Sequence, residues 1–324
     1  MSRYKVSIIG CGDIGFLFDH KKDIKGALTH FKAFNDSDKF EVVSVCEVRK
    51  EIGEIINNEH SIKVYEDYER MCSETRPEVI VIAANDESHF EILKKITVYN
   101  PGLVFCEKPL TLQYNETKEI VKLYEDKNIQ LQVNYTRRFL DEFYEIEKMI
   151  RQKVIGDLET VSFYYSRGLT HNASHYLDLV NWYIGETEKN LINVSLKEGI
   201  SKTDGTYSFD MIYENGLEIR FIGMNPTKLS FAEVDFIGSK GRVRINYKNE
   251  IEKYNIKENI LFKCYSSYNL YESNPVRVEK ALPNAAENIY NTLSGREELK
   301  SPASNSIKIF ELINRIKEKH PCQD

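Results

Sequence analysis

Six residues near the N-terminus have the spacing of a phosphate-binding turn. Residues 10–15, GCGDIG, follow a β-branched apolar segment and open a stretch that has the character of a helix. Glycines with this spacing allow a tight turn, close approach of the backbone to a pyrophosphate and close helix packing, with the helix N-terminus facing the anion. The alternative is a glycine-rich turn without a ligand. The residues assigned to a dinucleotide are Gly10, Gly12, Asp13, Ile14 and Gly15.

Glu47 stands at the end of the second predicted strand, where the adenosine ribose of such a cofactor is expected. A carboxylate there accepts hydrogen bonds from the ribose hydroxyls and repels a 2′-phosphate, which favours NAD over NADP. Glu47 lies further along the chain than the usual offset of about 20 residues, because Phe16–Lys25 has the composition of an inserted charged loop. Arg49 lies two residues beyond Glu47 and could hold a 2′-phosphate, so NADP stays open.

Glu107-Lys108-Pro109 ends the fifth predicted strand, at the sheet edge where doubly wound folds bind ligands. The Lys108 ammonium could donate a hydrogen bond to a substrate hydroxyl, and an oxidised nicotinamide nearby would lower its pKa toward a value suited to acid–base work. Glu107 and Lys108 are therefore assigned to the cofactor, and Lys108 also to catalysis. A solvated surface lysine is the alternative.

A second group of ionisable side chains lies in residues 169–178, LTHNASHYLD. If this segment is one helix, His171, His175 and Asp178 share a face, and apolar residues occupy the opposite face. The shared face would then point into a cleft, where imidazole suits proton transfer near neutral pH. We assign His175 to acid–base catalysis, and His171, Asn172 and Asp178 to the substrate. The alternatives are a zinc site and purely structural histidines.

Two more segments supply polar side chains near strand ends. Asn85 and His89 follow the fourth predicted strand, where they could reach the cofactor, although helix capping also explains this segment. Arg137 and Arg138 follow the sixth. Either could hold a substrate phosphate or carboxylate with two hydrogen bonds, or form salt bridges along a domain interface. We assign Arg138 to the substrate.

These groups require a parallel sheet to bring them together. From residue 4 to about residue 135, short β-branched runs alternate with segments of helical apolar spacing, which is typical of a doubly wound α/β sheet. Helices are expected over Ser88–Val98 and Leu112–Asp126, and residues 1–130 are predicted to form a Rossmann-like domain. The predicted strands are Lys5–Ile9, Glu41–Cys46, Lys63–Tyr65, Val79–Ala83, Leu103–Cys106 and Gln130–Tyr135.

The pattern changes after about residue 150, to one long helix followed by alternating strands. Asn215-Gly216 and Gly238–Gly241 indicate tight connections between strands, and helices near 284–293 and 305–319 close the chain. Residues 131–324 are predicted to form an α+β substrate domain with an open, mostly antiparallel sheet, although the final helices could pack on the first domain. Aromatic residues that alternate along one strand, such as Tyr207 and Phe209, could pack against a second copy in a homodimer or homotetramer.

The composition excludes several classes of protein. The 324 residues include 44 basic and 50 acidic side chains without a long run of one sign, which argues against nucleic acid or an anionic membrane as a partner. The longest apolar run is too short to span a bilayer and the N-terminus lacks a secretory signal, so a cytoplasmic protein is expected. The six cysteines lack CxxC spacing and are expected to be reduced and packed, although Cys11 could be a nucleophile.

Together these segments resemble the Gfo/Idh/MocA oxidoreductase family over nearly the whole chain. The resemblance implies a Rossmann domain followed by an open antiparallel sheet, a nicotinamide cofactor, and Lys108 beside the reacting carbon. The family's acidic residue one turn before the histidine is His171 here, which disfavours inositol or a simple aldose as substrate. The matching segments are residues 10–15, Glu47, ANDESH at 84–89, Glu107-Lys108-Pro109, NYTRRF at 134–139, IGD at 155–157, His175 to Asp178, and FIGSKG at 236–241.

The residues and the resemblance together predict an NAD-dependent oxidoreductase that moves a hydride to or from a secondary alcohol carbon of a sugar or nucleotide sugar. Lys108 and His175 would share the hydroxyl proton. HNASHYLD at 171–178 and FLFDHKKD at 16–23 are similar to members associated with surface-polysaccharide and nucleotide-sugar pathways. The alternatives are a dehydrogenase of free sugars or cyclitols, and a regulator that binds a dinucleotide without turnover.

Overall fold

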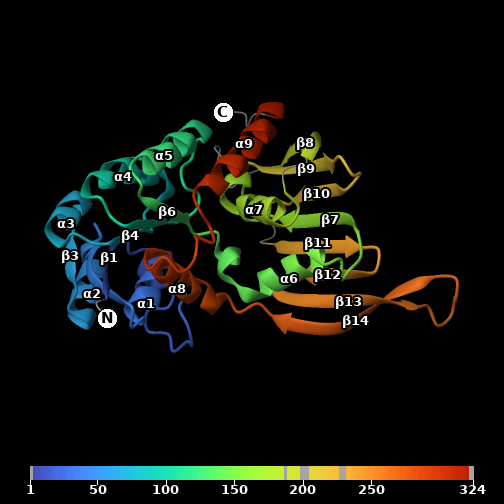
Figure 1. Ribbon diagram of the computed structural model, residues 1–324, viewed down its shortest axis with the longest axis horizontal. Coiled ribbons are helices and arrows are strands. Elements are labelled where there is room, and N and C mark those ends of the chain that lie inside the picture. The colour runs from blue at the N-terminus through green and yellow to red at the C-terminus, as the bar shows by residue number, and fades with distance from the viewer. Residues whose placement is uncertain (1–2, 186–187, 198–203, 226–230, 321–324) are drawn as a thin grey trace. The chain divides into compact units, whose positions relative to one another are not determined.

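The computed structural model describes residues 3–185, 188–197, 204–225 and 231–320 (Figure 1). The chain divides into two compact units, Met1–Leu140 with Arg277–Ile307, and Asp141–Val276 with Lys308–Asp324. The chain therefore leaves the first unit after residue 140 and returns to it at residue 277. The division into folding domains at residue 130 stays a prediction.

The first unit contains a parallel sheet, sheet A, in the strand order β3-β2-β1-β4-β5-β6. All its strand pairs are parallel, so every strand has its carboxyl end at the same edge. The predicted doubly wound sheet is confirmed, with nearly the predicted strand boundaries. The strands are β1 (Tyr4–Ile9), β2 (Phe40–Cys46), β3 (Lys63–Tyr65), β4 (Val79–Ile82), β5 (Leu103–Cys106) and β6 (Gln130–Val133).

Helices bury both faces of sheet A. Every residue of β4 and β5 is buried, which explains why these two strands are continuously apolar in the sequence. The last helix of this unit packs beside the end of β6, where Nδ2 of Asn284 donates to the carbonyl of Phe139 at 2.7 Å. The helices are α1 (His30–Asn35), α2 (Lys50–His60), α3 (Tyr68–Thr75), α4 (His89–Ile96), α5 (Tyr114–Asp126) and α8 (Ala281–Leu293).

The chain between the glycine motif and α1 is a loop, as the charged insertion predicted. The helix expected directly after the motif is only a five-residue π-helical turn, η1 (Asp13–Leu17). The loop then folds around Asp19, whose buried carboxylate accepts the N–H groups of Leu28 and Thr29 at 2.6 and 3.0 Å and the Thr29 hydroxyl at 2.6 Å. These bonds satisfy main-chain donors without a helix.

The second unit contains sheet B, in the order β14-β13-β12-β11-β7-β10-β9-β8, in which only the β7–β10 pair is parallel among the described strands. The mostly antiparallel sheet is confirmed, and so are the two predicted tight connections. Strand β7, which precedes the histidine segment at residues 169–178, was not predicted. The strands are β7 (Leu158–Tyr165), β8 (Glu188–Lys197), β9 (Thr206–Tyr213), β10 (Glu218–Gly223), β11 (Ala232–Gly238), β12 (Gly241–Ile245), β13 (Glu250–Glu258) and β14 (Ser266–Pro275).

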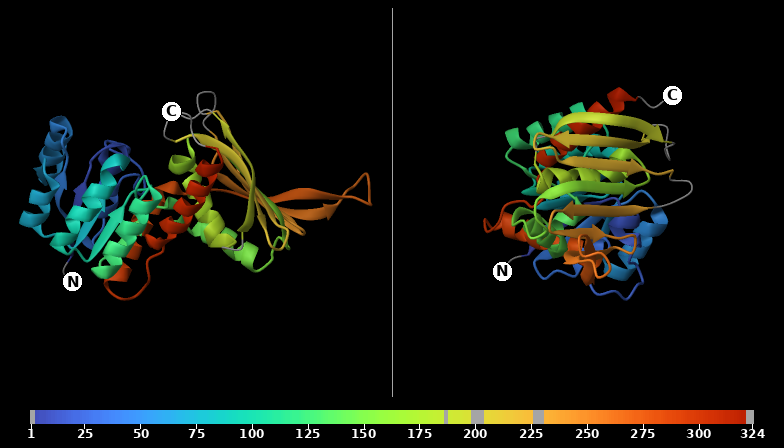
Figure 2. Two further views of the ribbon diagram at one scale, coloured as in Figure 1. Left: turned by 90° about the horizontal axis from the view of Figure 1, so that it is seen from above. Right: turned by 90° about the vertical axis from the view of Figure 1, so that its right-hand side faces the viewer.

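Helices cover one face of sheet B, as Figure 2 shows for α6 (Asp141–Arg151) and α7 (Ser174–Tyr183). Residues Tyr207 and Phe209 point into this covered face, because their side chains are 0% and 1% exposed. The expectation that these two side chains pack against a second copy is therefore wrong. Their alternation marks the face that α-helices bury within the unit. The final helix, α9 (Ser304–Lys319), begins in the first unit and continues in the second.

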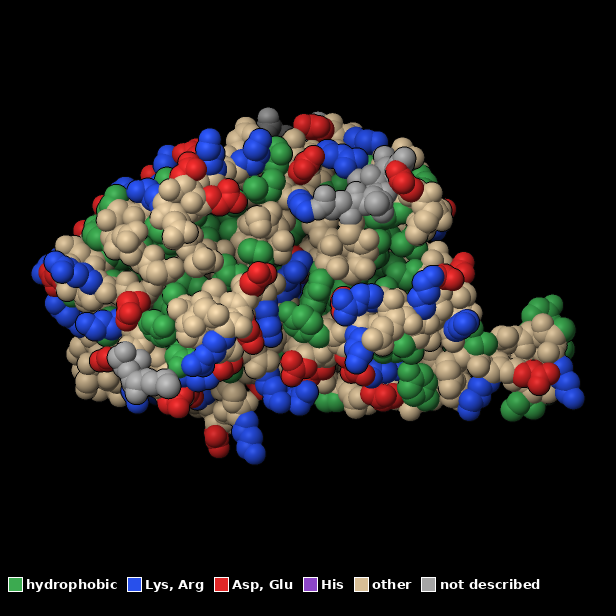
Figure 3. Space-filling view, in the orientation of Figure 1, with side chains coloured by type: hydrophobic (Ala, Val, Ile, Leu, Met, Phe, Trp, Pro, Cys, Tyr) green, Lys and Arg blue, Asp and Glu red, His purple; other side chains and the backbone are tan. Residues whose placement is uncertain are grey.

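Strands β13 and β14 extend into a hairpin arm whose tip carries exposed apolar side chains (Figure 3). Ile260 is 93% and Leu261 is 83% exposed. Cys264 is exposed at the same tip, so the expectation of a packed thiol is wrong for it. Within the described ranges, no helix is both long and apolar enough to cross a membrane. The buried thiols are Cys11, Cys46, Cys72 and Cys106, and Cys322 lies outside the described residues.

Candidate active site

The glycine loop lies at the carboxyl edge of sheet A, between β1 and η1. Gly10 has a φ of +90°, and a Cβ on Gly10 or Gly15 would overlap a main-chain carbonyl oxygen. A Cβ on Gly12 would meet only Nη2 of Arg49, at 3.5 Å, among the described neighbours. The first N–H bonded within η1 belongs to Phe16, so the N–H groups of residues 13–15 precede it. The loop therefore has the open, donor-rich side that a pyrophosphate needs.

The Glu47 carboxylate is buried beside this loop and accepts four hydrogen bonds. Its Oε2 accepts the Cys11 N–H at 2.9 Å and Nη2 of Arg49 at 2.7 Å. Its Oε1 accepts the main-chain N–H and Nε of Arg49, both at 2.9 Å. Burial raises the pKa of Glu47, but the bonds from Arg49 and Cys11 outweigh it and hold the pKa below its ordinary range.

Cys11 does not have the environment of a nucleophile. Burial raises the pKa of its thiol well above the ordinary range, and the Glu47 carboxylate raises it further. A reactive cysteine needs a stabilised thiolate, so the alternative of a Cys11 nucleophile loses its support.

Glu107 is also buried, at the end of β5. Its Oε1 accepts Nε2 of His30 at 2.8 Å and Nδ2 of Asn134 at 2.6 Å, and its Oε2 lies 3.2 Å from the Lys108 N–H. Burial raises the pKa of Glu107, but the hydrogen bond from His30 and the other donors outweigh it, so the pKa lies below its ordinary range. This network holds the backbone from which the half-buried Lys108 side chain leaves the sheet edge. His30 and Asn134 were not assigned from the sequence.

His89 is completely buried, and its two ring nitrogens lie close to main-chain carbonyl oxygens. Nδ1 is 2.8 Å from the Pro109 oxygen and Nε2 is 3.1 Å from the Ala84 oxygen. The ring thus ties the end of β4 to the turn after Lys108. Asn85 is exposed at the carboxyl end of β4. The assignment of both residues to the cofactor stays a prediction.

The histidine segment of the second unit is not one regular helix. It begins with a π-helical turn, η5 (Leu169–Ala173), and continues as α7. The Asp204 carboxylate accepts the N–H groups of Thr170 and His171 at 2.8 and 2.9 Å. A Cβ on Gly168 would overlap this carboxylate, so the glycine makes room for the cap. Asp204 was not predicted, because it lies 34 residues beyond Thr170 and no local pattern links the two.

The side chains of this segment differ in exposure, although His175 and Asp178 stand three residues apart within the regular helix α7. His171 is exposed, His175 is half-buried and Asp178 is 1% exposed. The wide turn of η5 rotates the segment before α7, so regular spacing does not hold across the junction. The substrate role of the buried Asp178 stays a prediction. Nδ2 of Asn172 donates to the Ser166 carbonyl at 2.7 Å.

A pocket of about 550 Å³ opens beside η5 in the second unit. It includes the predicted substrate residues His171 and Asn172 together with side chains that were not predicted. The added side chains come from the residue before Gly168, the start of β11 and the turn between β12 and β13. They are Arg167, Phe231, Ala232, Asn246, Tyr247 and Asn249. Arg138 lies in the first unit, half-buried in the turn after β6.

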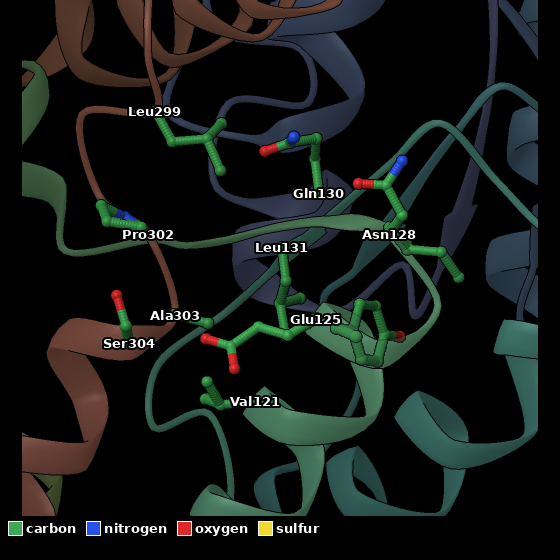
Figure 4. A pocket seen from close by; sticks show the side chains of 11 residues that line it. Val121, Glu125, Asn128, Gln130, Leu131, Leu299, Pro302, Ala303 and Ser304 are labelled. Atoms are coloured by element: carbon green, nitrogen blue, oxygen red, sulfur yellow. The ribbon is translucent and has the colours of Figure 1, made fainter.

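Another hollow, of about 310 Å³, lies between α5, the start of β6 and residues 299–304 (Figure 4). Val121 and Leu131 line one side, and Pro302 and Ala303 the other. It is at the amino end of β6, away from the carboxyl edge that carries the glycine loop. Among the described residues, no group of three His, Cys, Asp or Glu has the geometry of a metal site, so the zinc alternative has no support there.

Residues 4–135 match the family described as "Oxidoreductase family, NAD-binding Rossmann fold". Over 211 residues the chain is 26% identical to an inositol 2-dehydrogenase/D-chiro-inositol 3-dehydrogenase of Lactiplantibacillus plantarum. That alignment covers 60% of this chain and 56% of the enzyme. The chain thus spans little more than half the length of this curated relative.

Solved structures share the whole fold at low identity. The WlbA dehydrogenase from Bordetella pertussis in complex with NADH and UDP-GlcNAcA aligns with a TM-score of 0.75 and 17% identity, over 98% of this chain and 96% of that one. An oxidoreductase from Agrobacterium radiobacter in complex with NAD+, L-tartaric acid and magnesium aligns with a TM-score of 0.73 and 15% identity, over 97% and 95%. At these identities the likeness concerns the fold.

Proposed function

We propose that this chain, whose residues 4–135 match the Gfo/Idh/MocA family of NAD-binding oxidoreductases, transfers a hydride between NAD and a secondary alcohol carbon of a sugar or nucleotide sugar. The observation that carries the proposal is the shared position of the glycine loop, Glu47 and Glu107-Lys108 at the carboxyl edge of sheet A. Strand ends at this edge are where doubly wound sheets bind ligands.

The chain's own residues divide the work of this reaction. The main-chain N–H groups of the glycine loop would hold the pyrophosphate and Glu47 the adenosine ribose, while the bound nicotinamide supplies the hydride acceptor or donor. The Lys108 ammonium and the His175 imidazole are the proposed groups that hold and move the hydroxyl proton. The His30–Glu107–Asn134 network would keep the backbone at Lys108 in place.

The pocket beside η5 supports a substrate with several hydroxyl groups and one anionic group. The exposed Asn249 amide can donate to and accept from hydroxyls, the Asn172 side-chain oxygen can accept, and the Arg167 guanidinium suits a phosphate or carboxylate. Tyr247 is 66% exposed and offers an aromatic face for a sugar or base. These features favour a nucleotide sugar or a sugar acid over a free cyclitol. A place in surface-polysaccharide biosynthesis rests on the sequence resemblance alone.

Ligand-dependent stabilisation tests the proposal. We expect NAD or NADH to raise the melting temperature of the purified protein, and a nucleotide sugar to raise it further, because each ligand that binds the folded state stabilises it. NADH formation in proportion to substrate oxidised would distinguish the enzyme from a regulator that binds a dinucleotide without turnover. Absence of any shift with all four nicotinamide dinucleotides, in protein shown to be free of copurified cofactor, would overturn the proposal.

Self-association and a cytoplasmic location are further proposals. The hairpin arm supports a homo-oligomer better than the alternating aromatics do, since its apolar tip is exposed and Tyr207 and Phe209 are not. Light scattering of the wild type and of a variant with Ile260→Asp and Leu261→Asp tests this. We expect the variant to form a smaller oligomer than the wild type, or a monomer. An unchanged mass would remove the arm tip from the interface.

A further inference from the structure

The carboxylate that should receive the cofactor ribose is already saturated by its own chain. A carboxylate offers about four lone-pair positions, and Glu47 has four donors. Two of them are main-chain N–H groups, from Cys11 and Arg49, and these belong to the fold of the loop. The other two are Nε and Nη2 of the Arg49 guanidinium, one on each carboxylate oxygen. A ribose hydroxyl therefore finds no free acceptor on Glu47 while the guanidinium stays.

The guanidinium occupies the place that a ribose diol would take. Its two nitrogens bridge the two oxygens of Glu47, which is the geometry in which vicinal hydroxyls would donate, one to each oxygen. Nη2 also lies 3.5 Å from the position of a Cβ on Gly12, on the open side of the glycine loop. The Arg49 side chain has room to turn toward a ligand, because it is 49% exposed, whereas that of Glu47 is 3% exposed and stays in place.

We propose that Arg49 is a cofactor-selecting residue that holds Glu47 in the free protein, yields it to the ribose hydroxyls of NAD, and turns to the 2′-phosphate of NADP. The inference rests on the proposed function, since it concerns the dinucleotide of that reaction. An arginine fork binds a phosphate with two parallel hydrogen bonds, and it also offsets the charge of Glu47 that would repel the phosphate. In this chain an acidic residue at the end of β2 therefore does not exclude NADP.

Removal of the Arg49 guanidinium should weaken the binding of NADPH more than that of NADH. In Arg49→Gln, a ribose diol reaches Glu47 without a competing guanidinium, while a 2′-phosphate meets an uncompensated buried carboxylate. The ratio of the NADPH to the NADH dissociation constant is expected to rise about tenfold or more, mainly through weaker NADPH binding. Arg49→Lys keeps the charge without the fork and is expected to give an intermediate ratio.

The test is a titration of both reduced cofactors, followed by the fluorescence of the nicotinamide, which needs no turnover. Arg70→Gln is the matched control. Arg70 is also an exposed arginine paired with a glutamate of the first unit, at 2.8 Å from Glu74, but on α3. We expect the wild type to bind NADH and NADPH within about tenfold of each other, and Arg70→Gln to leave both constants unchanged.

Three results would overturn the inference and leave the proposed function standing. They are a wild type that binds NADH but not NADPH, an Arg49→Gln ratio within twofold of wild type, and equal losses for both cofactors in Arg49→Gln. A wild type that binds neither cofactor would overturn the proposed function as well. Urea denaturation of each variant checks that the protein is folded, and Arg49→Lys decides the matter if Arg49→Gln is not.

Discussion

The carboxyl edge of sheet A and the turn η5 before α7 in the second unit assemble their polar groups in different ways. In sheet A each contributor ends a strand, with Gly10 after β1, Glu47 after β2 and Glu107 after β5. Parallel strands place these ends at one edge without further devices. In the second unit antiparallel strands alternate in direction, and the N–H groups of Thr170 and His171 are held by the distant Asp204. In a parallel sheet, short sequence motifs at strand ends therefore predict the residues of a site, whereas in an antiparallel sheet they do not.

The largest expected effect, on turnover, tests whether both regions contribute a catalytic side chain. Lys108→Ala and His175→Ala should each lower turnover by about a hundredfold or more, with NADH affinity retained, because each removes a group that moves the substrate proton. Steady-state kinetics and cofactor titration measure both quantities. Lys127→Ala, on the exposed end of α5, is the control. Full activity in either site variant would remove that residue from the mechanism and leave the chemistry in the other unit.

The second effect separates two roles of the glycine loop, in stability and in dinucleotide binding. Gly15→Ala should destabilise the protein by about 2–3 kcal/mol, because its Cβ would overlap the Gly10 carbonyl. Gly12→Ala should leave the urea midpoint nearly unchanged yet weaken dinucleotide binding, since its Cβ projects to the open side. Urea unfolding and NADH titration separate the two. Equal stability losses for both variants would mean that the loop has no open side.

A third and smaller effect compares caps in the two units. Asp204→Ala should cost about 1–2 kcal/mol of stability, and so should Asp67→Ala, which removes the cap of α3 in the first unit. Only Asp204→Ala should also lower kcat, since it loosens the turn that leads to His175. Unchanged kcat in Asp204→Ala would make this cap purely structural.

The smallest effect concerns pH. The folded-state pKa of Glu107 lies below its ordinary value of 4.5, so its ionised form stabilises the fold above about pH 4.5, and this contribution is lost as pH falls further through the lowered pKa. Replacement by Gln should therefore cost about 1 kcal/mol at pH 7 and less in acid. Urea unfolding at pH 7 and pH 3.5 measures the difference, with the exposed Glu54→Gln as control. A cost that does not shrink in acid would contradict the assignment.

Much of the first unit was predictable because its signals are local. Apolar β-branched runs marked all six strands of sheet A, and glycine spacing marked the loop that the structure places at its edge. The predictions were weaker where regular periodicity was assumed. The π-helical turn at η5 interrupts the helix on which His171, His175 and Asp178 were expected to share a face, and Asp178 is buried. Strand β7 was not predicted, although its buried and exposed side chains alternate.

The sequence by itself determined where the parallel strands lie along the chain, the glycine loop and the strand-end positions of Glu47 and Lys108, because a strand and its following turn are contiguous in the chain. The tertiary structure alone decided which groups partner them. His30 reaches Glu107 from an element 77 residues away, Asp204 caps a turn 34 residues before it, and Arg49 covers the Glu47 carboxylate. Such pairs depend on burial and on the direction of each side chain, which spacing along the chain does not specify.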